Sequence, residues 1–410
     1  MAANNLTTIK FTSRMCLSLA REIYPEIVKL RRHLHQYPEL AFEERYTNKV
    51  IAHELSRLNI KTKNGVAGTG IVGILESNKR GRVIALRADM DALPVNEETG
   101  LPFASKHLGK MHACGHDTHM SMLIGAAKIL SKFRKELNGT VKFLFQPSEE
   151  KNPGGAPSMI KSGALSNPEV DVIFGQHITP DLPVGAVGIR PGPTMASADE
   201  IYITIYGKGG HGAKPHQAID PILISAHVIT ALQAIISRSR NPLDASVLTI
   251  GSIHGGTATN IIPDSVKLTG TFRAMNERWR AEAHLLIKQT AEQTTRGLGG
   301  KCKVEISRGY PVLINSEAET EFVRKAACEL LGKKSAVNIP PVMGAEDFAY
   351  YLQKKPGTFW WIGGSSRKTG RTTSLHSSRF KIDETAMIYG AAFLAYLTLR
   401  YLSGLGENKL

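Results

Sequence analysis

The 410-residue chain has only four cysteines, and they are too far apart to suggest a disulfide framework. Cys16, Cys114, Cys302 and Cys328 show no paired spacing, and no CxxC motif occurs. A small disulfide-stapled secreted domain is therefore excluded, and a structural zinc site is disfavoured because such sites usually use closely spaced Cys pairs. Scattered cysteines are typical of a reducing compartment, so we expect a cytoplasmic protein.

Long apolar segments are also missing. We expect no run that approaches the roughly 20 residues needed to cross a bilayer, and hence no membrane partner. The apolar stretch 15–20 is too short for the core of a signal peptide. Residues 1–21 lack acids and carry basic and hydroxyl side chains, so an organellar presequence is the alternative to a cytoplasmic start.

Acidic residues are scarce relative to basic ones, with 36 Asp and Glu against 51 Lys and Arg, which gives a net charge of +15. Such a charge can indicate an anionic partner such as nucleic acid. The basic residues are spread along the chain in ones and twos, however, and no nucleic-acid recognition motif accompanies them. We interpret the charge as a solvated basic surface and expect no nucleic-acid partner.

The length exceeds what one hydrophobic core usually spans, so two domains are expected. Short apolar runs alternate with helical patterns up to residue 187 and again from residue 307. This alternation predicts an α/β domain, built from 1–187 and 307–410, with a central mixed sheet flanked by helices.

Residues 188–306 show a different pattern, which predicts an inserted α+β domain. We expect its strands and helices, in the order β-α-β-β-α-β, at 199–206, 219–238, 246–253, 265–274, 278–296 and 302–307. That order is the ferredoxin-like sandwich. Because the first pattern resumes afterwards, the segment is an insertion that would serve as a lid or an oligomer interface.

The densest chemistry lies in residues 111–119, MHACGHDTH, which hold a thiol, three imidazoles and a carboxylate. Thiolate and imidazole are preferred ligands of borderline divalent metals such as Zn²⁺. Cys114 and His116 flank a glycine and could both turn inward from one tight loop. Without a second closely spaced pair, a catalytic metal site with ligands from distant segments is favoured over a structural one.

Polar residues follow three of the apolar runs, at 87–91, 146–150 and 175–177. Open α/β sheets bind ligands just outside the carboxyl ends of their strands, so these endings should converge on one site. Within it, adjacent Glu149 and Glu150 suit metal-assisted hydrolysis, one as a ligand and one taking a proton from water. The alternative is a solvated acidic turn.

Other candidates are ambiguous by themselves. Asp89 and Asp91 fit either helix capping or the orientation of a metal-binding histidine. His211 lies in the glycine-rich stretch 207–216, which lacks the order of a phosphate-binding loop. Its imidazole could stabilise an oxyanion, and a flexible hairpin tip is the alternative. His177 and His376 are single histidines, and they are candidate metal ligands only through a resemblance to a known family.

The chain resembles the aminoacylase/carboxypeptidase/amidohydrolase family of dinuclear metallopeptidases, in the branch of hippurate hydrolases and auxin–amino-acid conjugate hydrolases. The matching motifs cover almost the whole chain and lie at 32–40, 86–94, 111–119, 145–150, 207–216, 259–263, 343–348 and 375–376. Departures such as Ser148, 151–153 and Ser378 remove no ligand but leave the substrate preference open.

The resemblance implies a role for each matching residue. Two divalent ions per subunit, Zn²⁺ or Mn²⁺ in the first place and Co²⁺ or Ni²⁺ otherwise, would be held by Cys114, His116, Glu150, His177 and His376. Cys114 would bridge the ions as a thiolate, Glu149 would be general base and acid, and Asp89 and Asp91 would support the ligands. His211 and Asn260 would polarise the scissile carbonyl and bind substrate, with Arg273 on the substrate carboxylate.

The expected reaction is therefore hydrolysis of the amide bond of an N-acyl amino acid by a metal-activated water. The resemblance further implies a homodimer or homotetramer formed through the inserted domain. Two alternatives remain: a carboxypeptidase or dipeptidase of the same family, and a catalytically silent binding protein. The presence of all five ligands and Glu149 together argues against the silent one.

Overall fold

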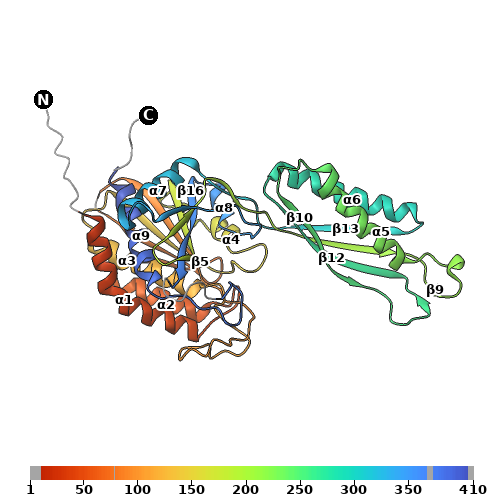
Figure 1. The fold of residues 1–410 in the computed structure, drawn as a ribbon. Helices are drawn as coiled ribbons and strands as arrows, with labels where there is room; N and C mark the ends of the chain where they lie inside the picture. The colour runs from red at the N-terminus through yellow and green to blue at the C-terminus, as the bar shows by residue number, and fades with distance from the viewer. Residues whose placement is uncertain (1–10, 78, 367–372, 405–410) are drawn as a thin grey trace. The chain divides into compact units, whose positions relative to one another are not determined.

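The computed structural model describes residues 11–77, 79–366 and 373–404, which form two compact units (Figure 1). Unit 1 combines Met1–Gly192, Asn315–Pro340 and Tyr350–Leu410, and unit 2 combines Pro193–Ile314 and Pro341–Ala349. The expected insertion, 188–306, thus differs from unit 2 by a few residues at each end and by the separate segment 341–349.

Unit 1 contains an eight-stranded mixed sheet, as expected for an α/β fold. Its strands, in spatial order, are β1 (Lys61–Val66), β2 (Gly70–Glu76), β4 (Gly139–Gln146), β3 (Arg82–Asp89), β5 (Val172–Pro183), β16 (Gly357–Ser365), β6 (Val187–Ile189) and β15 (Ala336–Asn338). The four central strands β4, β3, β5 and β16 are mutually parallel, so their carboxyl ends lie at the same edge. These strands are almost entirely buried, which explains why they read as continuous apolar runs.

The helices of unit 1 pack around this sheet. They are α1 (Ser13–Gln36), α2 (Arg45–Arg57), α3 (His116–Lys132), α4 (Ala156–Lys161), α7 (Glu317–Leu331) and α9 (Ala386–Leu402), while α8 (Ala349–Leu352) spans the junction of the units. Helices α1, α3 and α9 pack against one another. Gly125 makes this contact close, because a Cβ there would lie 2.8 Å from the Cβ of Ala391. The nearly fully buried α3 thus carries its first turn into the interior.

Helix α1 is longer than the sequence pattern suggested. The apolar positions from Ile23 predict a start near residue 23, but the helix begins at Ser13, capped by the side chain of Thr12. Cys16 and Ala20 are fully buried and continue the same apolar face. Residues 13–21 are therefore part of the unit 1 core, whereas the first ten residues of the presequence alternative lie outside the described residues.

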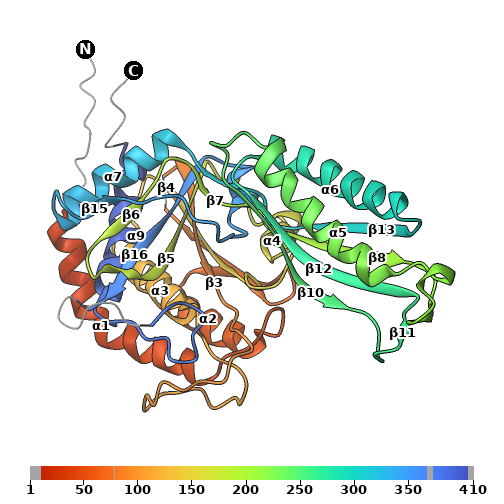
Figure 2. The ribbon, with the colours of Figure 1, turned by 45° about the vertical axis from the view of Figure 1, so that its right-hand side comes forward.

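Unit 2 has the element order β-α-β-β-α-β: β8 (Asp199–Tyr206), α5 (Pro221–Ala234) continued by η2 (Ile235–Ser239), β10 (Ser246–His254), β12 (Ser265–Ala274), α6 (Glu277–Gly297) and β13 (Lys301–Arg308). The strands form an antiparallel sheet in the order β10-β12-β8-β13. Helices α5 and α6 lie side by side (Figure 2). Alternate residues of β8 are buried, which is the pattern of a sheet covered on one face.

Smaller elements complete the fold. They are β7 (Gly192–Met195), β9 (Gly210–His211), η1 (Pro215–Gln217), β11 (Ile261–Ile262) and β14 (Leu313–Asn315). Strand β9 pairs with β11, and β14 pairs with β7.

The continuous helix Pro221–Ser239 corrects one sequence expectation. With 19 residues and a mean hydropathy of 1.4 over its most apolar window, it is long and apolar enough to cross a membrane by length and composition alone. In the structure its residues Ile224, Val228 and Leu232 are buried in the hydrophobic core of unit 2. Core helices of globular domains pass the same test, but only 28% of this window is buried, so packing accounts for part of its composition.

Candidate metal centre

Five side chains expected to bind metal come together at the carboxyl edge of the parallel strands. Cys114 lies in the loop before α3, and His116 is the first residue of that helix. Glu150 follows β4, His177 lies within β5, and His376 belongs to the segment before α9. The sequence pattern predicted that His177 follows a strand end, but β5 continues to Pro183, so its side chain projects from inside the strand.

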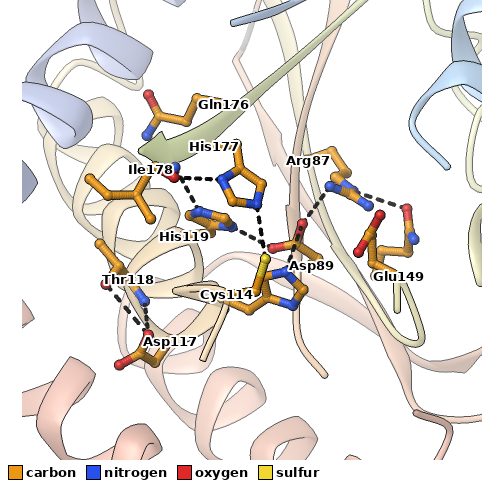
Figure 3. A network of polar contacts seen from close by, with 12 residues as sticks. Arg87, Asp89, Cys114, Asp117, Thr118, His119, Glu149, Gln176, His177 and Ile178 are labelled. Atoms are coloured by element: carbon orange, nitrogen blue, oxygen red, sulfur yellow. Dashed lines mark hydrogen bonds and ion pairs between the residues drawn. The ribbon is translucent and has the colours of Figure 1, made fainter. Parts of the chain in front are cut away.

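The distances between these side chains are short (Figure 3 shows Cys114 facing His177). The Sγ of Cys114 lies 3.3 Å from Nε2 of His177 and 3.3 Å from Nε2 of His376. The Oε1 of Glu150 lies 3.2 Å from Nε2 of His376 and 3.8 Å from Nε2 of His116. Three overlapping groups, Cys114–His116–His177, Cys114–Glu150–His376 and His116–Glu149–Glu150, each have ligand atoms within 4.8 Å of one another.

Backbone geometry brings the two ends of the Cys114 loop into place. Gly115 has φ +87°, and a Cβ there would lie 2.5 Å from Cγ2 of Ile178, so only glycine fits. Helix α3 starts at His116, and Gly115 is its cap. His376 has φ +65°, and its amide donates to the carbonyl of Ala113 over 2.8 Å, which joins the last candidate ligand to the Cys114 loop.

The histidine rings are oriented by their second nitrogen. Nδ1 of His116 lies 2.8 Å from the carbonyl oxygen of Asp91, and Nδ1 of His177 lies 2.6 Å from that of Ile178. Since these Nδ1 atoms donate to carbonyls, the Nε2 atoms are left as acceptors that face the cluster. This is the tautomer that binds a metal ion.

Asp89 and Asp91 hold the surrounding structure, each in a different way. Asp91 accepts the backbone amides of Glu149 and Glu150, both over 2.9 Å. Asp89 lies 2.6 Å from Nδ1 of His119 and also accepts from Arg87 over 2.7 Å (Figure 3). His119 in turn accepts the amide of Ile178 at Nε2 over 2.9 Å.

His119 was not singled out by the sequence argument, although it lies in the same motif. Its position three residues after His116 on one helix face is a signal that could have found it. Because both of its ring nitrogens are engaged by protein atoms, the structure gives it a supporting place beside β5.

The donor set fits divalent cations. Nε2 of His116 is buried and has no hydrogen-bond partner within the described residues, while Oε1 of Glu150 has the ion-pair contact to His376 given above. Burial, together with the charges of Glu150 and Glu149, raises the pKa of the Cys114 thiol well above its usual value. Orphaned buried ligand atoms are costly without a partner, and a divalent ion would supply both that partner and the charge that keeps Cys114 a thiolate.

The pKa values of the His177 and His116 imidazoles shift in opposite directions. Burial lowers the pKa of His177 well below its usual value. Burial also opposes protonation of His116, but the nearby carboxylates of Asp89, Asp91 and Glu150 outweigh it and raise its pKa to about 10. The carboxylates around His116 therefore favour positive charge at this position, which a divalent ion would supply.

The remaining expected site residues, His211, Asn260 and Arg273, belong to unit 2. His211 pairs with Ile261 in the β9–β11 ladder, and the adjacent amide of Gly212 donates to the carbonyl of Asn260 over 2.8 Å. Both side chains are exposed. Arg273 lies on β12 and donates to the carbonyl of Met343 over 3.3 Å. Their roles toward a substrate stay predictions.

Comparison with known families gives one match that covers most of the chain. The model of peptidase family M20/M25/M40 matches residues 85–400. These residues include all five candidate ligands and Glu149.

Individual relatives agree with this match. The chain is 40% identical over 384 residues to thermostable carboxypeptidase 1 of Saccharolobus solfataricus, covering 93% of this chain and 96% of the relative. It is 38% identical over 417 residues to the IAA-amino acid hydrolase ILR1-like 4 of Arabidopsis thaliana, covering 100% and 93%. The YXEP protein of Bacillus subtilis, described as a dinuclear metal-binding peptidase, has a solved structure with 35% identity and a TM-score of 0.81, covering 93% and 99%.

Proposed function

The chain belongs to peptidase family M20/M25/M40, and from that premise we propose that it is a metal-dependent amidohydrolase that cleaves N-acyl amino acids. The family consists of metal-dependent hydrolases, and the expected reaction class, amide hydrolysis, agrees with the names of its relatives. The expected substrate class is supported by the IAA-amino acid hydrolase of Arabidopsis thaliana, which is named for cleaving an acyl–amino acid conjugate.

The convergence of the ligand atoms is the observation that carries this proposal. A thiol, imidazole nitrogens and a carboxylate oxygen from four separate segments of the chain meet within short distances, and the buried Nε2 of His116 has no hydrogen-bond partner within the described residues. The resemblance assigns the same five residues to two metal ions. We infer Zn²⁺ or Mn²⁺ as the ions, with Co²⁺ or Ni²⁺ as alternatives, because thiolate and imidazole suit Zn²⁺ while carboxylates also admit the others.

When bound, divalent ions lower the pKa of water and polarise an amide carbonyl. The chain itself supplies the proton acceptor. Glu149 is buried beside Glu150, and its amide is fixed by Asp91 over 2.9 Å. We infer that the Glu149 carboxylate takes a proton from the attacking water and returns it to the leaving amine nitrogen, the dual role of a general base and acid.

Substrate binding falls to the residues of unit 2 in this proposal. His211 would donate to the developing oxyanion, Asn260 would bind the substrate, and Arg273 would pair with the free carboxylate of the amino acid. The neighbouring, exposed positions of His211 and Asn260 in paired strands support a joint role. We infer that unit 2 is the ferredoxin-like lid or dimerisation domain.

Assembly is also part of the proposal. Ile222 and Leu223 on α5 are 44% and 57% exposed, and these apolar side chains support a homodimer or homotetramer formed through unit 2. A cytoplasmic location stays a prediction from the cysteine pattern.

A second candidate activity is supported by the relative named a carboxypeptidase, which is 40% identical to this chain. A carboxypeptidase would use the same ligands and the same Glu149, and it would differ only in the pocket for the acyl side of the amide. The two activities are therefore separated by substrate and not by the metal centre.

The first experiment assays chelator-treated protein resupplied separately with Zn²⁺, Mn²⁺, Co²⁺ or Ni²⁺. Substrates are N-acetyl, N-benzoyl and indoleacetyl amino acids beside several dipeptides. We expect metal-restored cleavage of the acyl amino acids. Cleavage of dipeptides alone would establish the carboxypeptidase instead, and inactivity with every metal would contradict both.

Glu149→Gln tests the role of the base in the same assay. We expect the variant to retain wild-type metal content while kcat falls by about 10²- to 10⁴-fold, since a positioned acid–base group contributes that much. Glu136→Gln, an exposed glutamate of unit 1, is the control and should keep full activity. Wild-type turnover in Glu149→Gln would remove the base assignment.

A further inference from the structure

The loop that carries Glu149 and Glu150 is held by its backbone amides. After β4 ends at Gln146, the amides of residues 148, 149 and 150 are no longer part of the sheet. All three donate to buried carboxylates. Ser148 donates to Oε1 of Glu44, and Glu149 and Glu150 donate to the two oxygens of Asp91, each over 2.9 Å.

Backbone strain shows how closely this loop is specified. Ser148 has φ +55°, a left-handed conformation that a residue other than glycine rarely adopts. Its carbonyl accepts the amide of Gly155 over 2.8 Å. A Cβ on Gly155 would lie 1.9 Å from the carbonyl oxygen of Pro147, so the loop is tightly folded against itself. Such a conformation persists only where the surroundings hold it in place.

Helix capping does not explain Glu44. It is the residue before α2 and is fully buried, yet it makes no capping bond to that helix. The capping bonds come from Glu39, whose two oxygens accept the amides of Tyr46 and Thr47 over 3.0 and 2.8 Å. Because Glu39 caps the helix, the carboxylate of Glu44 is not used in capping and can face Ser148.

The second oxygen of Glu44 fixes the direction of the carboxylate. Oε2 accepts the hydroxyl of the buried Thr69, and the carbonyl of Thr69 is in turn held by the side-chain amide of Asn48 over 2.7 Å. With one oxygen anchored to Thr69, the other is presented to Ser148. A buried carboxylate is costly, so its retention at a site where Glu39 already caps the helix indicates a specific use.

We propose that Glu44 is a positioning residue for the metal centre: by accepting the Ser148 amide it fixes the loop from which Glu149 and Glu150 project. Asp91 accepts the backbone amides of the two acidic residues, and Glu44 adds a third backbone contact that orients the loop. The inference rests on the proposed function, in which Glu150 binds metal and Glu149 is the base, and it adds a residue 104 positions distant from the loop that it orients.

The test compares three variants by metal affinity and by activity. Glu44→Leu removes both acceptor oxygens at similar volume, and Glu44→Gln retains one oxygen for Ser148. Thr69→Val removes only the anchoring hydroxyl and leaves the acceptor of Ser148 in place. Metal affinity is measured by calorimetric titration of metal-free protein with Zn²⁺ or Mn²⁺ alone, and kcat is measured separately on the metal-loaded protein.

We expect Glu44→Leu to weaken metal binding and lower kcat by about 10- to 100-fold, the usual cost of losing a residue that orients a metal ligand. Glu44→Gln should recover most of both quantities, and Thr69→Val, which removes only the anchor of the carboxylate, should show a loss smaller than that of Glu44→Leu. All are measured well below the unfolding temperature of each variant, so that a loss of stability alone does not change either value.

Wild-type metal affinity and kcat in folded Glu44→Leu would overturn the inference, as would an equal loss in Glu44→Leu and Glu44→Gln. If Glu44→Leu does not fold, Glu44→Met, which has similar length and no strong acceptor, takes its place with the same expectations. Failure of the proposed function is distinguishable, because wild-type protein would then bind metal without cleaving any substrate, and the affinity series would still report on Glu44.

Discussion

Each unit contains a buried cluster of charged side chains, and the two clusters differ in how their polar atoms are satisfied. In unit 2, Asp199 accepts from Nε and Nη2 of Arg280, from Nε2 of His284 and from the amide of Gly309. Arg280 further donates to Glu277 and to the carbonyl of Gly309. We call these residues the Asp199 cluster. Every nitrogen of Arg280 and both oxygens of Asp199 have a protein partner.

The candidate metal-ligand cluster of unit 1 is mostly buried, apart from the exposed His376, and it is incomplete. Nε2 of His116 has no hydrogen-bond partner within the described chain, and the carboxylates of Asp89 and Glu150 lie 3.7 and 3.8 Å from it. Buried polar groups that lack partners are expensive, and natural proteins retain them where a ligand completes them. The comparison indicates that a complete cluster serves stability, while an incomplete one is prepared for cations.

The largest expected effect is a loss of metal affinity when the cluster of unit 1 is changed. Cys114→Ala removes the atom that contacts both His177 and His376, so we expect metal affinity to fall by more than about 100-fold, beyond the cost of losing a residue that only orients a ligand. Activity should fall with it. Metal content after dialysis and calorimetric titration measure the loss.

Cys16→Ala is the matched control for this change, because Cys16 is a second fully buried thiol of unit 1. It should bind metal like wild type while losing a little stability from the removed sulfur. Equal metal affinity in Cys114→Ala and wild type would mean that the thiol is not a ligand.

The second prediction concerns stability alone. Arg280→Met leaves Asp199 buried without its main cation, and breaking one side of a buried ion pair costs about 3–5 kcal/mol. Urea unfolding of unit 2, followed by hydrogen exchange in peptides of β8 and α6, should show this loss while metal affinity stays unchanged. Arg278→Met, on an exposed face of the same helix, should change stability by less than about 0.5 kcal/mol. Reduced metal affinity in Arg280→Met would contradict the separation of the two clusters.

The third prediction concerns the addition of a divalent metal to the metal-free protein. Metal at 100 times its dissociation constant should stabilise the site by about 2.7 kcal/mol, because it binds the folded state only. Hydrogen exchange should slow in peptides of β3, β4 and α3, and remain unchanged in peptides of β8 and α6. Equal protection in both sets would show that the Asp199 cluster also responds to metal.

Several features of the two units could be predicted from the sequence, because they depend on local patterns. Cys114 and His116 stand out by their spacing, and the strands of unit 2 follow from the alternation of apolar residues, with predicted bounds within a few residues of the observed ones. The start of α1 was missed because its first apolar residues, Cys16 and Ala20, are small and weak as a pattern, although both are buried.

What the sequence could not reveal depends on long-range pairing. Glu44 and Ser148 are 104 residues apart, and Asp199 and Arg280 are 81 residues apart, so no local pattern links either pair. The extension of β5 through His177 follows from its pairing with β16, which comes nearly two hundred residues later. The supporting contacts of a site are fixed by tertiary structure, and the residue types that make them are common in turns and caps.

The smallest expected effect concerns the pH dependence of the complete cluster. Burial by itself raises the pKa of Asp199, but its bonds to Arg280 and His284 outweigh burial and hold that pKa at about 2. Since the pKa of an unfolded Asp is about 3.9, the folded state binds the proton less readily, and the stabilisation is fully present above about pH 4 and lost as the pH falls through about 2. The difference amounts to about 2 kcal/mol.

In Asp199→Asn the stability deficit relative to wild type should therefore be largest near neutral pH and shrink between about pH 4 and pH 2, as measured by urea unfolding with hydrogen exchange in β8. Glu305→Gln, which removes an exposed ion pair with Lys303, should show little deficit at any pH. A deficit in Asp199→Asn that stays constant down to pH 2 would mean that the carboxylate gains nothing from Arg280 when ionised, and the cluster would then be held by packing and not by charge.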